Sequence, residues 1–492
     1  MMELGYEKLT AAEYGRMVNE GKIDPEVGIE YFISRIERLN PKINAFTYTR
    51  FEYARAEAKR LKQRLSQGEN VGPFAGVPFA LKDFLPSKKG WTASHGGVAS
   101  RITIDVEDSE FCKAMEKLGG IAIGKTNAPA YGFSGTCDNK LYGATHNPFD
   151  LSRNSGGSSG GSASAVASGM VLIAEGGDAG GSIRIPACWN NLFGMKPSAG
   201  LIPSVIRPDS YSATHPYCCN GGLTKSVEDS AILVNEMVKY EPRDPTSVPL
   251  TKVDYLQASK GNLREIRIGY TPDFGLFPVE KEVVQKMNEV LEVLAQSGAS
   301  VEELKFKFPR SAQEYMDMWC LSLSFDSVIE FDQLKEQGFD FLKDHRDEVS
   351  PIFVEWVKKA SNVSKKEIYE FNLMRTEILD AFEDAFEKYD LILSPTALCL
   401  APKNSPTKGL TSGPSEINGQ PIDANLGFAT TFLVNFIGYP AASIPAGLSA
   451  NGLPVGIHAI APKYRDERIY TLAKTIEDKL PWASYYQISY AV

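Results

Sequence analysis

A stretch rich in glycine and serine, residues 154–187, holds the side chains best suited to chemistry. Nine glycines fall among the 26 residues from Gly156 to Gly181, interleaved with serines. Glycines allow backbone conformations that direct several consecutive N–H groups to one point, where they can stabilise an oxyanion. A serine at the end of such a turn is a candidate nucleophile if a base can take its proton. The segment therefore predicts acyl transfer.

The base must come from elsewhere, because the chain has only five histidines and none lies in this stretch. Lysine can serve when burial disfavours its ammonium form. Lys82 directly follows the apolar run 76–81, which predicts a buried strand. This arrangement favours Lys82 as the base, Ser182 as the nucleophile, and Ser158 as a proton relay between them.

Three other interpretations of the stretch are open. A flexible linker is disfavoured because the run continues into small and apolar residues typical of a packed helix and strand. A phosphate-binding loop lacks the Gly-Lys-Ser/Thr that should follow it. Residues 157–161 formally match the G-x-S-x-G elbow of α/β-hydrolases, with Ser159 as nucleophile and His458 as its base. However, residues 147–154 before the elbow predict a loop instead of the strand that it needs.

Three segments together resemble the amidase signature hydrolases. They are residues 156–162 (Gly-Gly-Ser-Ser-Gly-Gly-Ser), 180–187 (Gly-Gly-Ser-Ile-Arg-Ile-Pro-Ala) and 194–198 (Gly-Met-Lys-Pro-Ser). The resemblance covers nearly the whole chain. It implies that Ser182 is the nucleophile, Lys82 the base, and Ser158 the bridging serine after a cis peptide bond at Gly157. It also implies an oxyanion hole made by the amides of Ala179, Gly180, Gly181 and Ser182.

Neighbouring residues are expected to support this site. We expect Ser159 to donate a supporting hydrogen bond, and Asp178 and Arg184 to pair across the nucleophile turn. Lys125 and Lys196 are alternative bases, although their sequence contexts favour structural roles.

The implied fold is α/β: one large domain over 1–492 with a mixed, twisted β-sheet covered by helices on both faces. The signature core spans about 70–205, and a helical region of about 310–390 is expected to form the substrate pocket. The N-terminal residues predict a helix capped by Thr10 and Glu13, then a helix from Pro25 that ends at Asn40-Pro41. The stretch 401–424 predicts a long surface loop.

The sequence constrains the choice of substrate less than it constrains the catalytic residues and the fold. Within the family, the chain is most similar to amidases that cleave nylon oligomers, one of which has a pocket cysteine where Cys320 falls. Tyr131, Trp319 and Cys320 are the candidate pocket residues. The alternative function is that of the ammonia-supplying component of a glutamine-dependent tRNA amidotransferase. Such components usually carry Gln where this chain has Ile185.

Composition limits the partners. The net charge of −9 argues against nucleic-acid binding, and scarce histidines with widely spaced cysteines argue against a metal. We expect no cofactor, and a small amide as the substrate. Seven cysteines without a C-x-x-C pair, no visible secretory signal and no apolar run of spanning length predict a cytoplasmic protein without membrane attachment. Dimers are common among relatives, which favours a homodimer.

Overall fold

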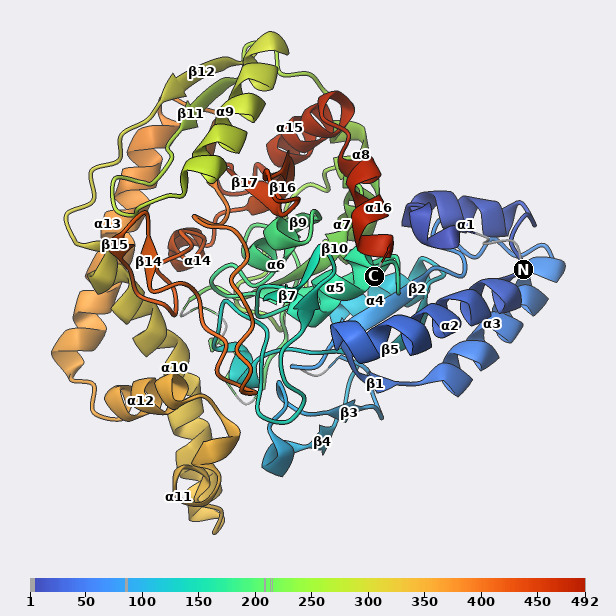
Figure 1. Cartoon of the computed structure of the whole chain (residues 1–492), viewed down its shortest axis with the longest axis horizontal. Helices are drawn as coiled ribbons and strands as arrows, with labels where there is room; N and C mark the ends of the chain where they lie inside the picture. The colour runs from blue at the N-terminus through green and yellow to red at the C-terminus, as the bar shows by residue number, and fades with distance from the viewer. Residues whose placement is uncertain (1–4, 85–86, 208, 213, 215, 492) are drawn as a thin grey trace.

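An eleven-stranded mixed sheet forms the centre of the protein in a computed structural model that describes residues 5–84, 87–207, 209–212, 214 and 216–491 (Figure 1). The strands, in order across the sheet, are β1 (Phe46–Thr49), β5 (Ile121–Thr126), β2 (Pro78–Lys82), β8 (Ile173–Asp178), β10 (Cys219–Thr224), β9 (Phe193–Lys196), β16 (Ala441–Leu448), β17 (Pro454–Ile460), β13 (Leu391–Pro395), β11 (Arg267–Tyr270) and β12 (Ser300–Glu303). Strand β2 runs parallel to β5 and β8, and β11 runs parallel to β12 and β13. The remaining neighbours are antiparallel, so the sheet is mixed as predicted.

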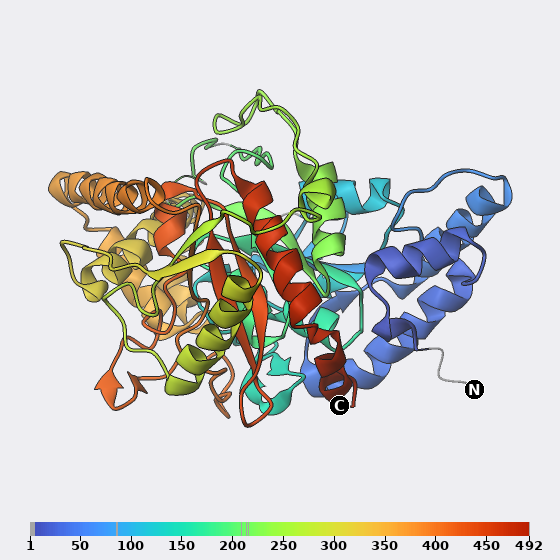
Figure 2. The ribbon, with the colours of Figure 1, turned by 90° about the horizontal axis from the view of Figure 1, so that it is seen from above.

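Helices cover both faces of the sheet (Figure 2). Two short helices pack together on one face: α5 (Gly160–Ala167), against β2 and β8, and α6 (Arg184–Trp189), against β16 and β17. The opposite face carries α4 (Glu110–Lys117), α7 (Val227–Met237), α9 (Lys281–Gln296) and α15 (Asp466–Lys479). The predicted α/β fold is thus confirmed.

The other helices lie mainly at the two ends of the molecule (Figures 1 and 2). The N-terminal end consists of α1 (Ala11–Asn19), α2 (Pro25–Ile43) and α3 (Phe51–Ser66). The opposite end consists of α10 (Ala312–Glu336), α11 (Phe341–Asp344), α12 (Pro351–Ala360) and α13 (Lys365–Phe386). Shorter helices are α8 (Tyr255–Ala258), α14 (Leu433–Ile437) and α16 (Tyr486–Tyr490). Two-stranded sheets are formed by β3 (Thr92–Ala93) with β4 (Thr103–Ile104), β6 (His146–Asn147) with β7 (Asp150–Asn154), and β14 (Glu416–Ile417) with β15 (Gln420–Pro421).

The hydrophobic core has two parts. The larger part lies between the central sheet and its helices. The smaller part is rich in aromatic rings and packs around α10, α12, α13 and the segment 426–439, as in the stacking of Tyr131 on Phe353. The second part therefore packs α10, α12 and α13 against the segment 426–439, outside the main core.

Three local predictions need correction or refinement. The capping box of Thr10 with Glu13 is present, but α2 continues past Pro41 and ends only at Ile43. Proline removes its own N–H without preventing a last turn, and the Asn40 side chain accepts from the N–H groups of Ala45 and Phe46 just beyond the helix end. Residues 147–154 belong to the β6–β7 hairpin instead of a loop, and the stretch 401–424 contains β14 and β15.

Candidate active site

Lys82, Ser158 and Ser182 all line one cavity of about 230 Å³. Lys82 is the last residue of β2, and Ser182 follows the end of the neighbouring parallel strand β8 by four residues. The carboxyl ends of parallel strands meet at the same edge of a sheet, which is where α/β proteins commonly place their sites. Ser158 enters the same cavity from the turn before α5. The fold therefore brings together three residues that are far apart in sequence.

The lysine and the bridging serine are in direct contact. Lys82 Nζ donates a hydrogen bond to Ser158 Oγ over 2.7 Å, and both side chains are buried. Nζ also lies 3.5 Å from the carbonyl oxygen of Gly177. Burial lowers the pKa of Lys82 to about 8, although neighbouring negative groups act in the opposite direction. About a tenth of this amine is therefore neutral at pH 7, and about half at pH 8, and this neutral form can accept a proton.

The turn that carries Ser158 has the backbone expected from the family resemblance. The Gly157–Ser158 peptide bond is cis. The next residue, Ser159, donates its backbone N–H to the carbonyl oxygen of Ser182 over 3.2 Å. Its hydroxyl is buried and makes no hydrogen bond within the described part of the chain. Ser159 thus joins the two serine turns through its main chain.

A buried ion pair holds the turn that carries Ser182. Arg184 Nη2 lies 2.8 Å from Asp178 Oδ1, and neither side chain is exposed. The predicted pairing of these two residues is confirmed. Burial tends to raise the pKa of Asp178, but the guanidinium of Arg184 outweighs it and holds that pKa well below its usual range. Asp178 therefore stays ionised and also accepts the backbone N–H of Gly181 (2.7 Å).

Two residues that the sequence did not reveal, and His458 in a role other than the base considered above, complete this network. Thr431 and Asn435, from the segment around α14, reach the nucleophile turn: Thr431 Oγ1 donates to the carbonyl of Gly180 (2.6 Å), and Asn435 Nδ2 donates to Asp178. His458 of β17 lies 2.7 Å from Arg184 Nη1. These residues are about 250 positions or more from the turn, so only the fold shows their role.

The four predicted oxyanion-hole amides are not equivalent. The N–H of Gly181 is bonded to Asp178, whereas those of Ala179, Gly180 and Ser182 make no hydrogen bond to another residue that the structure describes. Trp319 Nε1 donates to the carbonyl of Ala179 over 2.9 Å, which fixes that peptide group. Gly181 has φ +129°, and a Cβ there would lie 2.0 Å from Thr431 Oγ1. The turn consequently requires glycine at this position.

The alternative bases lie elsewhere. Lys125 is fully buried and ion-paired to Asp105 at 2.6 Å, and Lys196 Nζ donates to the carbonyl of Pro197 (2.9 Å). Neither residue lines the cavity. His458, the base that the elbow interpretation requires for Ser159, is buried against Arg184, and burial together with that cation lowers its pKa well below the usual range. The Gly/Ser stretch is itself buried, which excludes a flexible linker.

The cavity walls are partly those expected. Tyr131 and Trp319 line the cavity, but Cys320 does not. The Cys320 thiol is buried and accepts from Asn425 Nδ2 (3.4 Å), and Asn425 lines a second cavity of about 260 Å³. Additional apolar walls, which the sequence did not reveal, come from Phe84, Ile206, Pro216 and Leu323.

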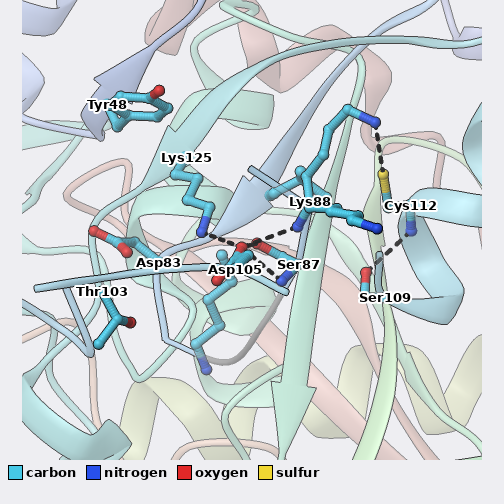
Figure 3. Close-up of polar contacts among 12 residues, drawn as sticks. Tyr48, Asp83, Ser87, Lys88, Thr103, Asp105, Ser109, Cys112 and Lys125 are labelled. Atoms are coloured by element: carbon cyan, nitrogen blue, oxygen red, sulfur yellow. Dashed lines mark hydrogen bonds and ion pairs between the residues drawn. The ribbon is translucent and has the colours of Figure 1, made fainter. Parts of the chain in front are cut away.

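Among the residues that the structure describes, one group could offer ligands to a metal. Ligand atoms of Asp108, Cys112 and Glu116 lie within 4.8 Å of one another. Lys88 Nζ already donates to Glu116 over 2.6 Å, so an ammonium group occupies the carboxylate that a metal would need (Figure 3 shows Lys88 and Cys112). This group gives no support for a metal site.

Comparison with known proteins agrees with the geometry. The family model described as Amidase matches residues 28–470, and the chain belongs to this family. The acylamidase of Rhodococcus erythropolis is 30% identical over 98% of both chains. A component of the glutamyl-tRNA(Gln) amidotransferase of Microcystis aeruginosa is also 30% identical, over 95% of this chain and 96% of its own length. Membership of this family makes the chain a hydrolase of carbon–nitrogen amide bonds.

Among the solved structures of the family, an aryl acylamidase is more similar to this chain than the nylon-oligomer amidase that the sequence suggested. A bacterial aryl acylamidase of the amidase signature family superposes with a TM-score of 0.95 at 36% identity, over 98% of this chain and 99% of that one. The 6-aminohexanoate cyclic dimer hydrolase gives 0.85 at 27% identity, over 97% and 98%. The expected similarity to nylon-oligomer amidases is thus present but more distant. No helix in the described ranges has both the length and the apolar character needed to cross a membrane.

Proposed function

We propose that this protein hydrolyses small, largely apolar amides through an acyl-enzyme on Ser182, with Lys82 as base and Ser158 as proton relay. The observation that carries the proposal is the 2.7 Å contact of the Lys82 amine with the Ser158 hydroxyl, inside the cavity that Ser182 also lines. An amine whose pKa burial lowers to about 8 is suited to general-base catalysis near neutral pH.

The steps follow from this arrangement. Neutral Lys82 takes the proton of Ser158 while Ser158 takes that of Ser182, and the Ser182 oxygen attacks the amide carbon. The resulting oxyanion faces the amides of Ala179, Gly180 and Ser182. Return of the proton through Ser158 to the nitrogen releases the amine. Water, activated by the same path, then cleaves the ester and frees Ser182.

The cavity favours an aromatic or aliphatic substituent on the amide. Aromatic and aliphatic side chains, including Tyr131, Trp319 and Leu323, form much of its wall. The structural similarity to an aryl acylamidase supports an aryl amide as substrate, and the more distant hydrolase supports a linear or cyclic oligomeric amide as a second choice.

The ammonia-supplying component of a tRNA amidotransferase remains the alternative, because such proteins are 30% identical to this chain. One feature of the cavity disfavours it. Among the described residues that line the cavity, Lys82 is the only Lys or Arg, while Glu175 and Asp326 are acidic. Among these described wall residues, the carboxylate of glutamine would find no cation other than the proposed base.

A substrate panel tests the proposal. The purified chain alone should hydrolyse 4-nitroacetanilide or a longer acyl 4-nitroanilide faster than it releases ammonia from glutamine. Ser182→Ala should lose all such activity, and Ser204→Ala, outside this cavity, should retain it. Glutamine hydrolysis as the dominant reaction, with no turnover of anilides, would favour the amidotransferase alternative.

A further inference from the structure

A buried carboxylate, Glu175, lies beside the proposed base. It belongs to β8, lines the cavity, and is 6% exposed. Its Oε2 accepts the backbone N–H of Lys82 over 3.1 Å, and its Oε1 accepts the hydroxyl of Ser109 over 2.6 Å. The steps proposed above do not use this residue.

The hydrogen bond to Lys82 takes the place of a strand-to-strand bond. Strand β2 pairs with β8 at Phe79 with Ile173 and at Ala80 with Ala174, and the pairing ends there. The N–H of Lys82, two residues further on, is bonded to the Glu175 side chain instead. The same strand offers the Gly177 carbonyl to Lys82 Nζ at 3.5 Å. Strand β8 therefore contacts both the main chain and the amine of the lysine.

Two lysines act on the charge of Glu175: Lys125 from β5, whose influence is the larger, and Lys82 from β2, which is also hydrogen-bonded to the carboxylate through its main chain. Lys125 is already ion-paired with Asp105 at 2.6 Å (Figure 3). From α4, the thiol of Cys112 faces the carboxylate, and burial raises its pKa so that it stays neutral. Asp178 also acts on Lys82, but its own partner is Arg184.

We propose that Glu175 is a positioning residue for Lys82, fixing its main chain by the hydrogen bond and strengthening its hold on a proton by negative charge. The inference rests on the proposed role of Lys82 as the base. Burial favours the neutral amine, and an anion in the same wall opposes that effect. Without the anion, Lys82 would lose its proton at lower pH and return it to the leaving amine more readily.

The ionisation state of Glu175 suits this role. Burial raises its pKa to about 7, while hydrogen bonds from Ser109 and from the Lys82 N–H favour the charged form. The carboxylate is therefore mostly ionised above pH 7, in the upper part of the range in which Lys82, with a pKa of about 8, titrates. Because the two groups interact, the pH profile reports them as a coupled pair.

The test is the pH dependence of Ser182 phosphonylation by a fluorophosphonate probe, in which the serine oxygen displaces fluoride from phosphorus. The inactivation rate should fall at low pH as Lys82 becomes protonated, and we call this fall the acid limb. In Glu175→Gln, the acid limb should move to lower pH by about half a unit or more, because a nearby negative charge is gone. Asp229→Asn is the matched control: Asp229 is a buried carboxylate that accepts the N–H groups of Ala11 and Ala12, and it does not line the cavity. In the control variant, the acid limb of the inactivation rate should stay at the wild-type pH.

Ser109→Ala provides a second variant if Glu175→Gln does not fold. It keeps the carboxylate but removes a hydrogen bond that favours its charged form, so the limb should move in the same direction by a smaller amount. Its structural cost is confined to the N-cap of α4, where Ser109 accepts the Cys112 N–H (Figure 3).

An acid limb that stays at the wild-type pH in whichever of these variants fold, whatever happens to the absolute rate, overturns the inference. The proposed function fails separately: Ser182 of the Lys82→Ala variant would then be phosphonylated at the wild-type rate and with the wild-type pH profile. If Lys82→Ala is inert and the limb of Glu175→Gln is unmoved, only the role of Glu175 is wrong.

Discussion

At the scale of single residues, the proposed chemistry depends on the protonation state of Lys82. Its amine is buried, contacts Ser158 at 2.7 Å and makes no ion pair with any described carboxylate. Burial lowers its pKa to about 8, so the neutral, basic form increases as pH rises through that value.

A pH profile follows from this. Below pH 8, kcat/KM for an anilide should fall by about tenfold per pH unit, because each unit removes nine-tenths of the neutral amine. Above pH 8 it should level off. Steady-state rates from pH 5.5 to 9.5 measure the limb. A limb near pH 6.5 that disappears on replacing a histidine would show that the base is not Lys82.

At the scale of elements, the turn between β8 and α6 depends on the Asp178–Arg184 pair. Both side chains are fully buried, and both bond to the segment 431–435. Removing one member of a buried pair leaves the other charge uncompensated.

Asp178→Leu should therefore lower the free energy of unfolding by about 3–5 kcal/mol. Glu69→Leu is the control, because Glu69 pairs with Arg64 at the surface and its loss should lower the free energy of unfolding far less. Urea denaturation followed by circular dichroism measures both. Equal losses in the two variants would show that the buried pair does not stabilise the turn.

Helix α10 contributes to the turn through Trp319, whose indole N–H holds the Ala179 carbonyl at 2.9 Å. Trp319→Phe keeps an aromatic wall but removes this donor, so kcat should fall about tenfold while KM changes little. Trp319→Ala also removes the wall and should raise KM as well. Steady-state kinetics on one anilide distinguish the two effects. A Trp319→Phe enzyme with wild-type kcat would assign Trp319 to packing alone.

At the scale of the whole molecule, the α/β fold with helices on both faces followed from the sequence because strand and helix patterns alternate along the chain. The proximity of Lys82 to the Gly/Ser segments could also be predicted, because these residues lie in short segments that resemble the motifs of the family. Thr431, Asn435 and Glu175 could not: the first two approach the turn only after about 250 residues of chain, and Glu175 has no local pattern. That Cys320 does not line the cavity could not be predicted either, because it depends on how α10 packs.

The single chain should be sufficient for activity. If this protein is a stand-alone amidase, adding the partner proteins of a tRNA amidotransferase should leave anilide hydrolysis unchanged, and light scattering tests the homodimer expected from the sequence. Activity that appears only with such partners would support the amidotransferase alternative instead.

Mass spectrometry of the protein after reaction with a fluorophosphonate probe tests most directly whether Lys82 and Ser158 activate Ser182. We expect one adduct, on Ser182, that forms in the wild type and is lost in Lys82→Ala and in Ser158→Ala, while circular dichroism shows that both variants remain folded. An adduct on Ser159, or an adduct on Ser182 that forms equally fast without Lys82, would contradict this expectation.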